Sequence, residues 1–208
     1  SQCEFSTFFL AKRIAGELDI PIIHTYHTVY EDYTHYFSPQ KAWGRSLVQM
    51  MTRKLSDQVD AMIAPSGKIE RILEGYRVSC PVNVVPSGID TEKYRKRIDD
   101  RSKETLRKQY GIKEDEIVFV YVGRMAKEKN IEELLWYQKS VQKNIKLVLV
   151  GDGPYRTTLE EKAKEYQVTD SVIFTGMVSP DEVARYYQIG DLFVSASTSE
   201  TQGMTYDE

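Results

Sequence analysis

Two cations, Arg124 and Lys129, lie on either side of a short loop in the segment GRMAKEKN, between an apolar run and a helical pattern. A guanidinium and an ammonium beside the free N–H groups of a helix start suit the charge of a diphosphate. The same segment could equally be a solvated basic turn whose side chains bind nothing. The residues alone leave both interpretations open.

Carboxylates and imidazoles form the other candidate chemistry. Glu200 and Glu208 stand eight positions apart in SETQGMTYDE, with only a glycine-containing turn between them. Three histidines, His24, His27 and His35, fall within twelve residues. They lack the Cys or Glu at fixed offsets that marks a zinc site, so no metal is expected.

The elements that must position these residues alternate along the chain. The run IVFVYVG is apolar on both faces, as expected for a parallel strand covered on both sides. The apolar patterns predict strands over residues 20–25, 60–64, 82–86, 117–123, 146–151, 171–176 and 191–197. The helical patterns cover 5–18, 40–56, 66–74 (N-cap Ser66), 101–110, 131–142, 155–166 and 181–187 (N-cap Ser179, then Pro180).

This alternation predicts an α/β fold of βαβ units around open parallel sheets. The segment 87–95 interrupts the pattern, so we expect two regions, 1–88 and 89–208. The first region has about three strands, few for a complete doubly wound sheet. The chain is therefore expected to be an internal piece of a larger protein; the alternative is a complete small protein with frayed ends.

Composition excludes several classes of protein. The 208 residues are 41% hydrophobic and 28% charged, which is typical of a soluble globular chain. A net charge of −3 argues against nucleic acid as a partner. No apolar run of about 18 residues occurs, so no membrane span is expected, and no signal peptide is expected either. Two distant cysteines, Cys3 and Cys80, favour a cytosolic protein with incidental thiols.

In an open parallel sheet, ligands bind beyond the carboxyl ends of the strands. The segments that follow the last four predicted strands are GRMAKEKN, GDGP, TGMVS and STSETQGM, and glycine there lets a ligand approach the backbone closely. Two of these segments carry a family resemblance. GRMAKEKN resembles the G-R-x-x-x-x-K segment of retaining GT-B glycosyltransferases (glycosyltransferase family 4, group 1), and the chain end resembles their E-x7-E motif.

VPSGID and LVGDGP also resemble segments of that family, and the four occur in the expected order. The resemblance covers the whole chain. It implies a GT-B architecture of two Rossmann-like parallel-sheet domains, both incomplete here, so the piece by itself is expected to be inactive. Residues 1–88 would be the second half of the N-terminal, acceptor-side domain, and 89–208 most of the C-terminal domain that binds the nucleotide-sugar donor.

The resemblance also implies roles for the two glutamates. Glu200 would contact the transferred sugar as a catalytic residue, and Glu208 would hold the ribose of the nucleotide. A carboxylate accepts two hydroxyl hydrogen bonds at once, which suits a vicinal diol. Backbone N–H groups of Gly203, Met204 and Thr205, at a helix start, would face the leaving diphosphate. Alternatively, Glu208 is an acid in the first turn of a helix.

By the same resemblance, Arg124 and Lys129 would neutralise the departing diphosphate in place of a metal. Val178 would touch the nucleotide base through its backbone. The expected reaction moves a hexose from a nucleotide sugar, UDP-glucose by resemblance, to a hydroxyl with retention of configuration. No tightly bound cofactor is expected.

The segment HTYHTVYEDY resembles that of bacterial 1,2-diacylglycerol 3-glucosyltransferases. His27 would then sit at the transferred sugar and help to position it; alternatively it caps a helix or packs on aromatic rings. Tyr30, with Tyr26 and Tyr33, could line an acceptor groove or simply pack in the core.

An enzyme that acts on a lipid must reach a bilayer. Residues 41–55 predict an amphipathic helix with Trp43 near its apolar face and Arg45, Arg53 and Lys54 around it. This pattern suits an interfacial helix attracted to anionic lipids. It suits a helix of the domain core with a solvated basic face equally well. The interfacial interpretation predicts a cytoplasmic protein, peripheral on the inner face of the cell membrane.

Other functions stay open at this point. The same chemistry could act on a cell-wall or capsule glycan, which lipid binding by residues 41–55 would distinguish. A non-catalytic module would bind nucleotide without turnover. A sugar-nucleotide epimerase of similar architecture would need no acceptor.

Overall fold

A computed structural model describes residues 1–2, 6–36, 41–141 and 144–208, without side-chain placement at residues 6, 34–36, 41 and 42. The chain divides into two compact units. We call Ser1–Gly88 with Ser199–Gly203 the first unit, and Ile89–Thr198 with Met204–Glu208 the second unit. Cys3 and the expected first residues of two helices, at 5 and 40, lie outside the described residues, and so does the His35 side chain.

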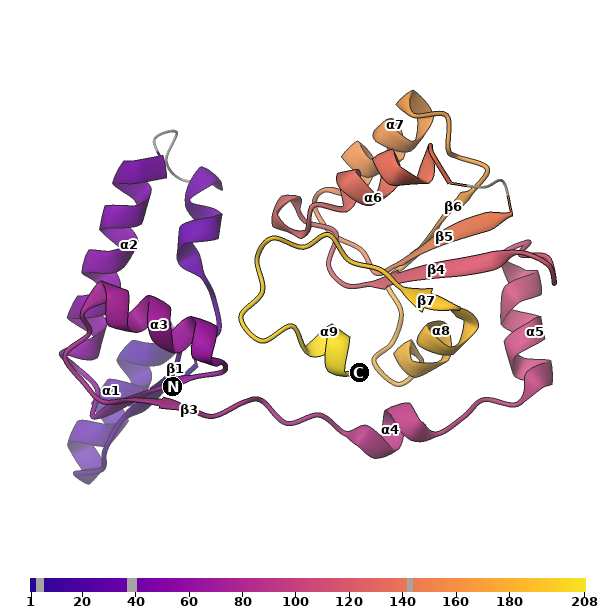
Figure 1. The fold of residues 1–208 in the computed structure, drawn as a ribbon. Helices are drawn as coiled ribbons and strands as arrows, with labels where there is room; N and C mark the ends of the chain where they lie inside the picture. Colours follow the sequence, from indigo (N-terminus) through magenta and orange to yellow (C-terminus); the bar gives the residue numbers. More distant parts are fainter. Residues whose placement is uncertain (3–5, 37–40, 142–143) are drawn as a thin grey trace. The chain divides into compact units, whose positions relative to one another are not determined.

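The first unit is built around a small parallel sheet (Figure 1). Among its described residues, three strands pair in the order β1-β2-β3. Its elements in chain order are α1 (Ser6–Leu18), β1 (Ile23–Thr25), the 3-10 helix η1 (Tyr30–Tyr36), α2 (Lys41–Ser56), β2 (Ala61–Ala64), α3 (Gly67–Tyr76) and β3 (Val82–Val84).

The core of the first unit lies where these helices meet the sheet. Met62 and Ala64 of β2 are fully buried, and so are Ile69 and Leu73 on α3. Ile69 and Leu73 are four residues apart, so they project from the same face of α3. The core therefore follows the 3.6-residue period of α3 and the two-residue period of β2.

The second unit has a larger parallel sheet. Among its described residues, four strands pair in the order β6-β5-β4-β7. Its elements are α4 (Thr91–Arg95), α5 (Asp100–Gln109), β4 (Ile117–Val122), the 3-10 helix η2 (Lys127–Lys129), α6 (Ile131–Gln138), β5 (Ile145–Val150), α7 (Arg156–Glu165), β6 (Val172–Gly176), α8 (Val183–Ile189), β7 (Leu192–Phe193) and α9 (Met204–Asp207).

Helices cover both faces of this sheet: α6 and α7 lie on one side, and α5 and α8 on the other (Figure 1). Residues of β5 alternate between the two faces, as the two-residue period of a strand requires. Leu147 and Leu149 belong to the core under α6 and α7, and Val148 and Val150 to the core under α5 and α8. This double burial confirms the α/β prediction.

Most predicted strands and helices are observed with ends shifted by one or two residues. The strand predicted from residue 20 begins only at Ile23, because Pro21 has no N–H for a ladder and the Ile22 N–H donates to the Asp60 carboxylate at 2.7 Å. The polar aromatic stretch after it, left unassigned from sequence, forms η1.

Three predicted boundaries in the second unit were wrong. Ser179 and Pro180 do not begin α8; the Glu182 N–H donates to the Ser179 carbonyl at 3.0 Å, so a turn precedes the helix, whose N-cap is Glu182. The helix predicted over 131–142 ends at Gln138, whose side-chain amide donates to the Ile145 carbonyl at 2.9 Å.

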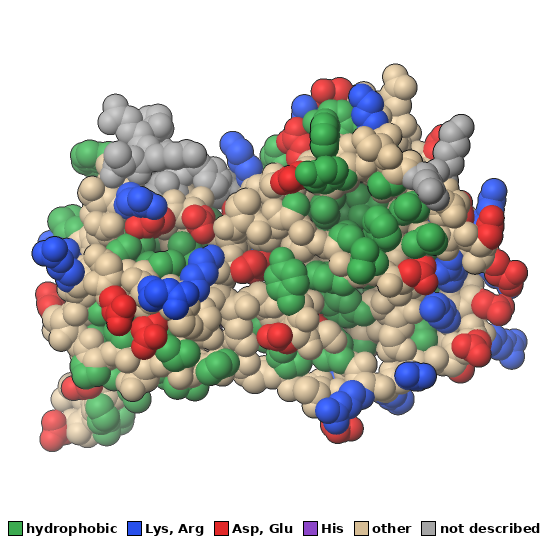
Figure 2. Space-filling view, in the orientation of Figure 1, with side chains coloured by type: hydrophobic (Ala, Val, Ile, Leu, Met, Phe, Trp, Pro, Cys, Tyr) green, Lys and Arg blue, Asp and Glu red, His purple; other side chains and the backbone are tan. Residues whose placement is uncertain are grey.

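The last predicted strand is also shorter than expected. Only Leu192 and Phe193 pair with β4 as a strand, although the Val194 N–H still donates to the Val120 carbonyl at 2.8 Å. After this point the chain turns away toward η2. On the face of each unit drawn in Figure 2, basic and acidic side chains are interspersed.

Candidate functional site

The loops that follow β4, β5 and β6 are joined to one another by backbone hydrogen bonds. The Met125 N–H donates to the Asp152 carbonyl at 2.8 Å, and the Tyr155 N–H returns a bond to Met125 at 3.0 Å. The Gly151 N–H donates to the Gly176 carbonyl at 3.1 Å. The carboxyl edge of this sheet is therefore a rigid backbone platform, at the place where ligands bind in open parallel sheets.

Glycine is required for this platform because the loops touch backbone to backbone. A Cβ atom at Gly151 would lie 2.2 Å from the Gly123 carbonyl oxygen. At Gly153 it would lie 2.3 Å from the Met125 carbonyl oxygen. Both distances are far below any van der Waals contact, so the sequence GDGP reflects a steric requirement in addition to possible access for a ligand.

Arg124 and Lys129 bracket η2, directly before α6. The Arg124 guanidinium pairs with the carboxylate of Glu128, which is 2% exposed, whereas the Arg124 side chain is 53% exposed. The buried end of the pair thus fixes an arginine that still reaches solvent. Lys129 closes the 3-10 turn, and its N–H donates to the Ala126 carbonyl at 3.0 Å. Both cations therefore stand on an ordered turn at the carboxyl edge of the sheet.

Glu128 was not identified from the sequence. Its backbone carbonyl accepts the Thr198 N–H and the Thr198 hydroxyl, both at 3.3 Å. Within the described residues, its Oε2 atom has no hydrogen-bond partner although it is buried. The spacing of four residues from Arg124 was the available signal. Glu128 therefore joins the cation loop to the segment that follows β7.

Glu208 is held by tyrosines. The Tyr187 hydroxyl donates to Glu208 Oε2 at 2.7 Å. Burial, and then the Glu208 carboxylate, raise the pKa of Tyr94 to about 12. The same two causes raise the pKa of Tyr187 well above its usual range. Both phenols therefore stay protonated at neutral pH and act as donors toward this carboxylate.

The other predicted donor-binding residues lie at the start of α9 and after β6. Gly203 has φ +78°, a conformation that favours glycine, and it directly precedes Met204 and Thr205 in the first turn. Val178 follows β6, and its side chain packs against the core under α5 and α8. Val178 is only partly buried there, so its backbone contact with a ligand stays a prediction.

In the first unit, the segment Ser199–Gly203 is attached to the carboxyl edge of the three-stranded sheet. The Lys68 ammonium, in the first turn of α3, donates to the Glu200 carbonyl at 2.8 Å. The Ser66 hydroxyl, just beyond β2, donates to the Thr201 carbonyl. Ser66 is the N-cap of α3 as predicted, but it makes no side-chain capping bond to the described helix.

Gln202 completes the attachment. Its side-chain carbonyl accepts the Ser87 N–H at 2.7 Å, and its NH2 group donates to the Ser87 carbonyl at 3.1 Å. His27 follows β1 at the same edge of the sheet and is exposed. The structure therefore brings His27 and the Glu200 segment to one edge of the first unit, an arrangement that spacing in the sequence does not reveal.

The residues predicted to contact an acceptor or a membrane differ in their exposure and in their partners within the protein. The Trp43 side chain is 68% exposed on α2. Arg45 pairs with Glu31 of η1 at 2.7 Å, and Arg53 donates to the Tyr76 carbonyl, so both arginines tie α2 to its neighbours. Tyr30, with Tyr26, and Lys54 line an apolar pocket.

Over residues 1–2, 6–36, 41–141 and 144–208, no helix combines the length and apolarity needed to cross a bilayer. In that same part of the chain, no three His, Cys, Asp or Glu side chains lie together as a metal site would require. His24 is fully buried and packs edge-on to Phe8, with ring centroids 6.2 Å apart.

Two parallel sheets, each with helices and loops at its carboxyl edge, define an α/β protein of the GT-B class. Solved structures support this class. Sucrose-phosphate synthase from Thermosynechococcus elongatus gives a TM-score of 0.76 at 23% identity, over 95% of this chain and 50% of that one. Anabaena HepE in complex with UDP-glucose gives 0.75 at 16% identity, over 93% and 51%.

The chain belongs to the glycosyltransferases: the model "Glycosyl transferases group 1" matches residues 102–208, and "Glycosyltransferase Family 4" matches residues 1–93. It is 43% identical to the alpha-monoglucosyldiacylglycerol synthase of Streptococcus pneumoniae, over 100% of this chain and 48% of that protein. It is 33% identical to the synthase of the same name from Acholeplasma laidlawii, over 99% and 54%. The chain thus spans about half the length of these relatives.

Proposed function

We propose that the complete protein is a retaining hexosyltransferase that moves glucose from UDP-glucose to the free hydroxyl of a diacylglycerol. The observation that carries the proposal is 43% identity, along the whole chain, to a protein named alpha-monoglucosyldiacylglycerol synthase. The rigid carboxyl edge of the second unit and its two cations support a nucleotide-sugar site. Residues 1–88 serve as part of the acceptor-side domain, and residues 89–208 as most of the donor domain.

Arg124 and Lys129 bind the diphosphate of the donor. The position of the Arg124 charge is set before substrate arrives, because Glu128 fixes it, and η2 orders the backbone that carries Lys129. Preorganised charge of this kind stabilises a leaving diphosphate more in the transition state than in the ground state. The N–H groups at the start of α6 add a partial positive charge on the same side.

The remaining donor contacts follow from the loops. Glu208, oriented by the Tyr187 and Tyr94 hydroxyls, accepts the ribose hydroxyls, and the backbone of Val178 meets the base. The N–H groups of Gly203, Met204 and Thr205 face the phosphates. UDP-glucose is a substrate in this scheme, and no resident cofactor is needed.

In the transfer step, the bond between the anomeric carbon and the β-phosphate oxygen breaks. The acceptor oxygen attacks the same face of the sugar, and its proton passes to the departing phosphate oxygen. His27 and the Glu200 carboxylate hold the sugar hydroxyls during this step. A carboxylate bound to two hydroxyls keeps the ring oriented while charge develops.

The acceptor is a membrane lipid, so the protein works as a peripheral protein on the cytoplasmic face of the cell membrane. Trp43 and Lys54, both exposed on α2, make the first contacts with anionic lipids. Arg45 and Arg53 contribute less, because each already has a partner within the protein.

Calorimetric titration of the complete protein with UDP, UDP-glucose and GDP tests the donor site. UDP is expected to bind, and Arg124→Ala is expected to weaken it by at least about tenfold, or ~1.4 kcal/mol. Arg185→Ala is the matched control: Arg185 also pairs with a nearby glutamate, at 3.2 Å, and it should leave the affinity unchanged.

A transfer assay with UDP-glucose and dioleoylglycerol tests the reaction. Glu200→Ala and Arg124→Ala should each abolish most transfer, because one removes a sugar contact and the other a phosphate contact. Full transfer by either variant would refute the assigned site. Binding of UDP without any turnover would instead identify a nucleotide-binding module.

A further inference from the structure

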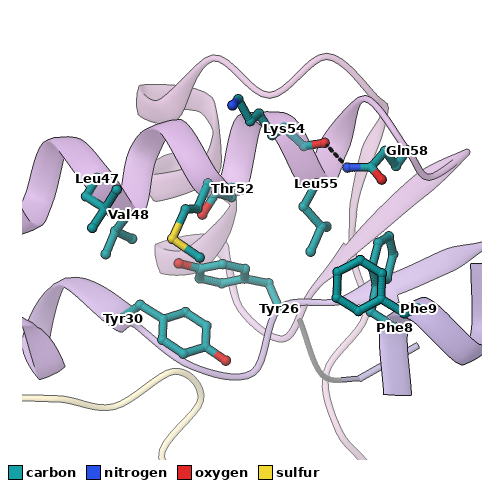
Figure 3. Close-up of a pocket in the computed structure, with 11 residues that line it drawn as sticks. Phe8, Phe9, Tyr26, Tyr30, Leu47, Val48, Thr52, Lys54, Leu55 and Gln58 are labelled. Carbon is teal, nitrogen blue, oxygen red and sulfur yellow. Dashed lines mark hydrogen bonds between the residues drawn. The ribbon is translucent and has the colours of Figure 1, made fainter. Parts of the chain in front are cut away.

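The first unit contains an apolar pocket of about 430 Å³ between α1, α2 and the segment after β1 (Figure 3). This volume falls within the range for small-molecule sites, roughly 300–1,000 Å³. Its walls include Phe8, Tyr26, Tyr30, Leu47, Met51 and Leu55. They come from three separate parts of the chain.

The deep part of the pocket is lined by buried side chains, and its mouth is apolar as well. Phe8, Tyr26 and Leu55 are at most 7% exposed, whereas Phe9 and Met51 at the rim are 68% and 49% exposed. An open mouth lined by large apolar side chains costs free energy in water unless something covers it. The occupant that this pocket favours is therefore apolar.

The Gln58 side chain, the one amide among the described lining residues, is already engaged. The Gln58 NH2 group donates to the Lys54 carbonyl at 2.6 Å, and the Gln58 carbonyl accepts from Lys12 at 2.9 Å. None of the described lining residues carries a carboxylate. Three hydroxyls and the Lys54 ammonium are too few for the amides of a peptide or the phosphates of a nucleotide, most of which would be buried at a high desolvation cost. A hydrocarbon chain brings no such groups.

The positive charge of Lys54 at the rim of the pocket suits the surface of a lipid bilayer. Lys54 is exposed and lies on the wall formed by α2, and the segment that forms another wall also carries His27. Tyr26 and Tyr30 flank His27 in the sequence, so one short loop contributes both to the pocket and to the carboxyl edge of the sheet. A lipid with its hydroxyl at that edge would have its tail near these tyrosines.

We propose that this pocket binds one acyl chain of the glycerolipid acceptor, so that its walls help to select acceptors by chain length. The inference rests on the proposed function for the identity of the lipid, and on the pocket itself for the acyl chain. Each additional buried methylene should tighten binding about three- to fourfold until the pocket is full.

Direct binding of dioctanoylglycerol, below its aggregation concentration, to the complete protein tests the inference without any membrane. Met50 and Met51 provide a matched pair: they are adjacent on α2 and 47% and 49% exposed, but only Met51 lines the pocket. Met51→Glu should weaken binding at least about tenfold, because it places a carboxylate on the apolar wall. Met50→Glu should stay within about twofold of the unmodified protein.

Leu47→Trp is a second variant that narrows the pocket without adding charge. It should lower affinity for dioctanoylglycerol more than for dihexanoylglycerol, while far-ultraviolet circular dichroism confirms an unchanged fold. Equal weakening by Met50→Glu and Met51→Glu would overturn the inference. So would a failure of the unmodified protein to bind either probe, as expected if another segment or a second copy fills the pocket.

Transfer from UDP-glucose, measured on the same samples, separates the two proposals. Tight binding that depends on Met51, without transfer to any diacylglycerol, supports the acyl-chain site and contradicts the proposed function. Transfer with an unchanged KM for every chain length in Met51→Glu supports the function and contradicts the acyl-chain site.

Discussion

The two units order their carboxyl edges by different means. In the second unit, backbone hydrogen bonds and glycines join the loops, and a buried glutamate fixes an arginine on one of them. In the first unit, side chains of Ser66, Lys68 and Gln202 attach a segment that is distant in sequence. A backbone-ordered edge is rigid before ligand arrives, whereas an edge held by single side-chain bonds is more easily rearranged.

Breaking the backbone platform at the carboxyl edge of the second unit should give the largest loss of stability. Gly151→Ala places a Cβ 2.2 Å from a carbonyl oxygen at a residue whose φ is +127°. We expect a loss of about 3 kcal/mol or more in the free energy of unfolding of the second unit, measured by urea denaturation.

Gly111→Ala is the control for that change. Gly111 also has positive φ, +66°, but a Cβ there has no described heavy atom within 4 Å. Its cost should be only about 1–2 kcal/mol, the usual penalty for a left-handed residue. Equal costs at the two positions would mean that backbone contact between the loops does not matter.

The buried glutamate offers the next test. Glu128→Gln keeps the shape of the side chain but removes the charge that fixes Arg124, so UDP should bind about tenfold more weakly. Calorimetry measures this, and thermal melting reports any loss of stability separately. Glu182→Gln, which removes the partner of the exposed Arg185, should change neither quantity; a similar loss there would show that Glu128 has no special role.

Breaking a bond that attaches the segment Ser199–Gly203 to the first unit should have a smaller effect. Ser66→Ala removes one hydrogen bond to Thr201, worth about 0.5–1.5 kcal/mol. The described α3 loses no side-chain cap with it. We expect faster limited proteolysis within Ser199–Gly203 and a nearly unchanged melting temperature. Thr105→Ala removes an exposed hydroxyl bond within α5 and should not change the cleavage rate.

The smallest effect on stability should come from a change of pH that protonates Asp152, at the carboxyl edge of the second unit. The Gly153 N–H, and then Arg156, lower the pKa of Asp152, which also accepts bonds from them at 2.7 and 3.0 Å. A depressed carboxyl contributes stability above its unfolded pKa of about 3.9, and this is lost as pH falls through the folded pKa.

Asp152→Asn should therefore lower the melting temperature slightly at pH 7 and not at all at pH 2. Melting curves across this range check the sign. A larger effect in acid than at neutral pH would contradict the assigned cause. Asp115→Asn, at an exposed turn before β4, is the control for loss of a surface charge.

The sequence predicted the sheets well because buried parallel strands are continuous apolar runs. The apolar runs that form β4 and β5 are typical of buried strands and of little else. The predicted length of β7 was too great because apolar residues continue after its pairing with β4 stops. Beyond the paired residues, the chain is hydrogen-bonded to η2 through Thr198 instead. The start of α8 was misplaced because Ser-Pro fits a turn as well as a helix start.

The site was less predictable than the fold. Arg124 could be chosen from its place after a strand, but its pairing with Glu128 depends on the 3-10 turn between them. The apolar pocket combines α1 with α2, so no local pattern reveals it. The assignments of His27, Glu200 and the donor contacts stay predictions until the variants above are measured.

Gln202 has a consequence for sequence drift in this family. Its side-chain amide copies a peptide group: it accepts from the N–H of Ser87 and donates to the carbonyl of the same residue. This contact involves only the backbone of residue 87, so the side chain at that position is free to change. Position 202 is not, because glutamate lacks the donor and asparagine is one methylene shorter. A substitution map of the chain should therefore be permissive at one end of this contact and strict at the other.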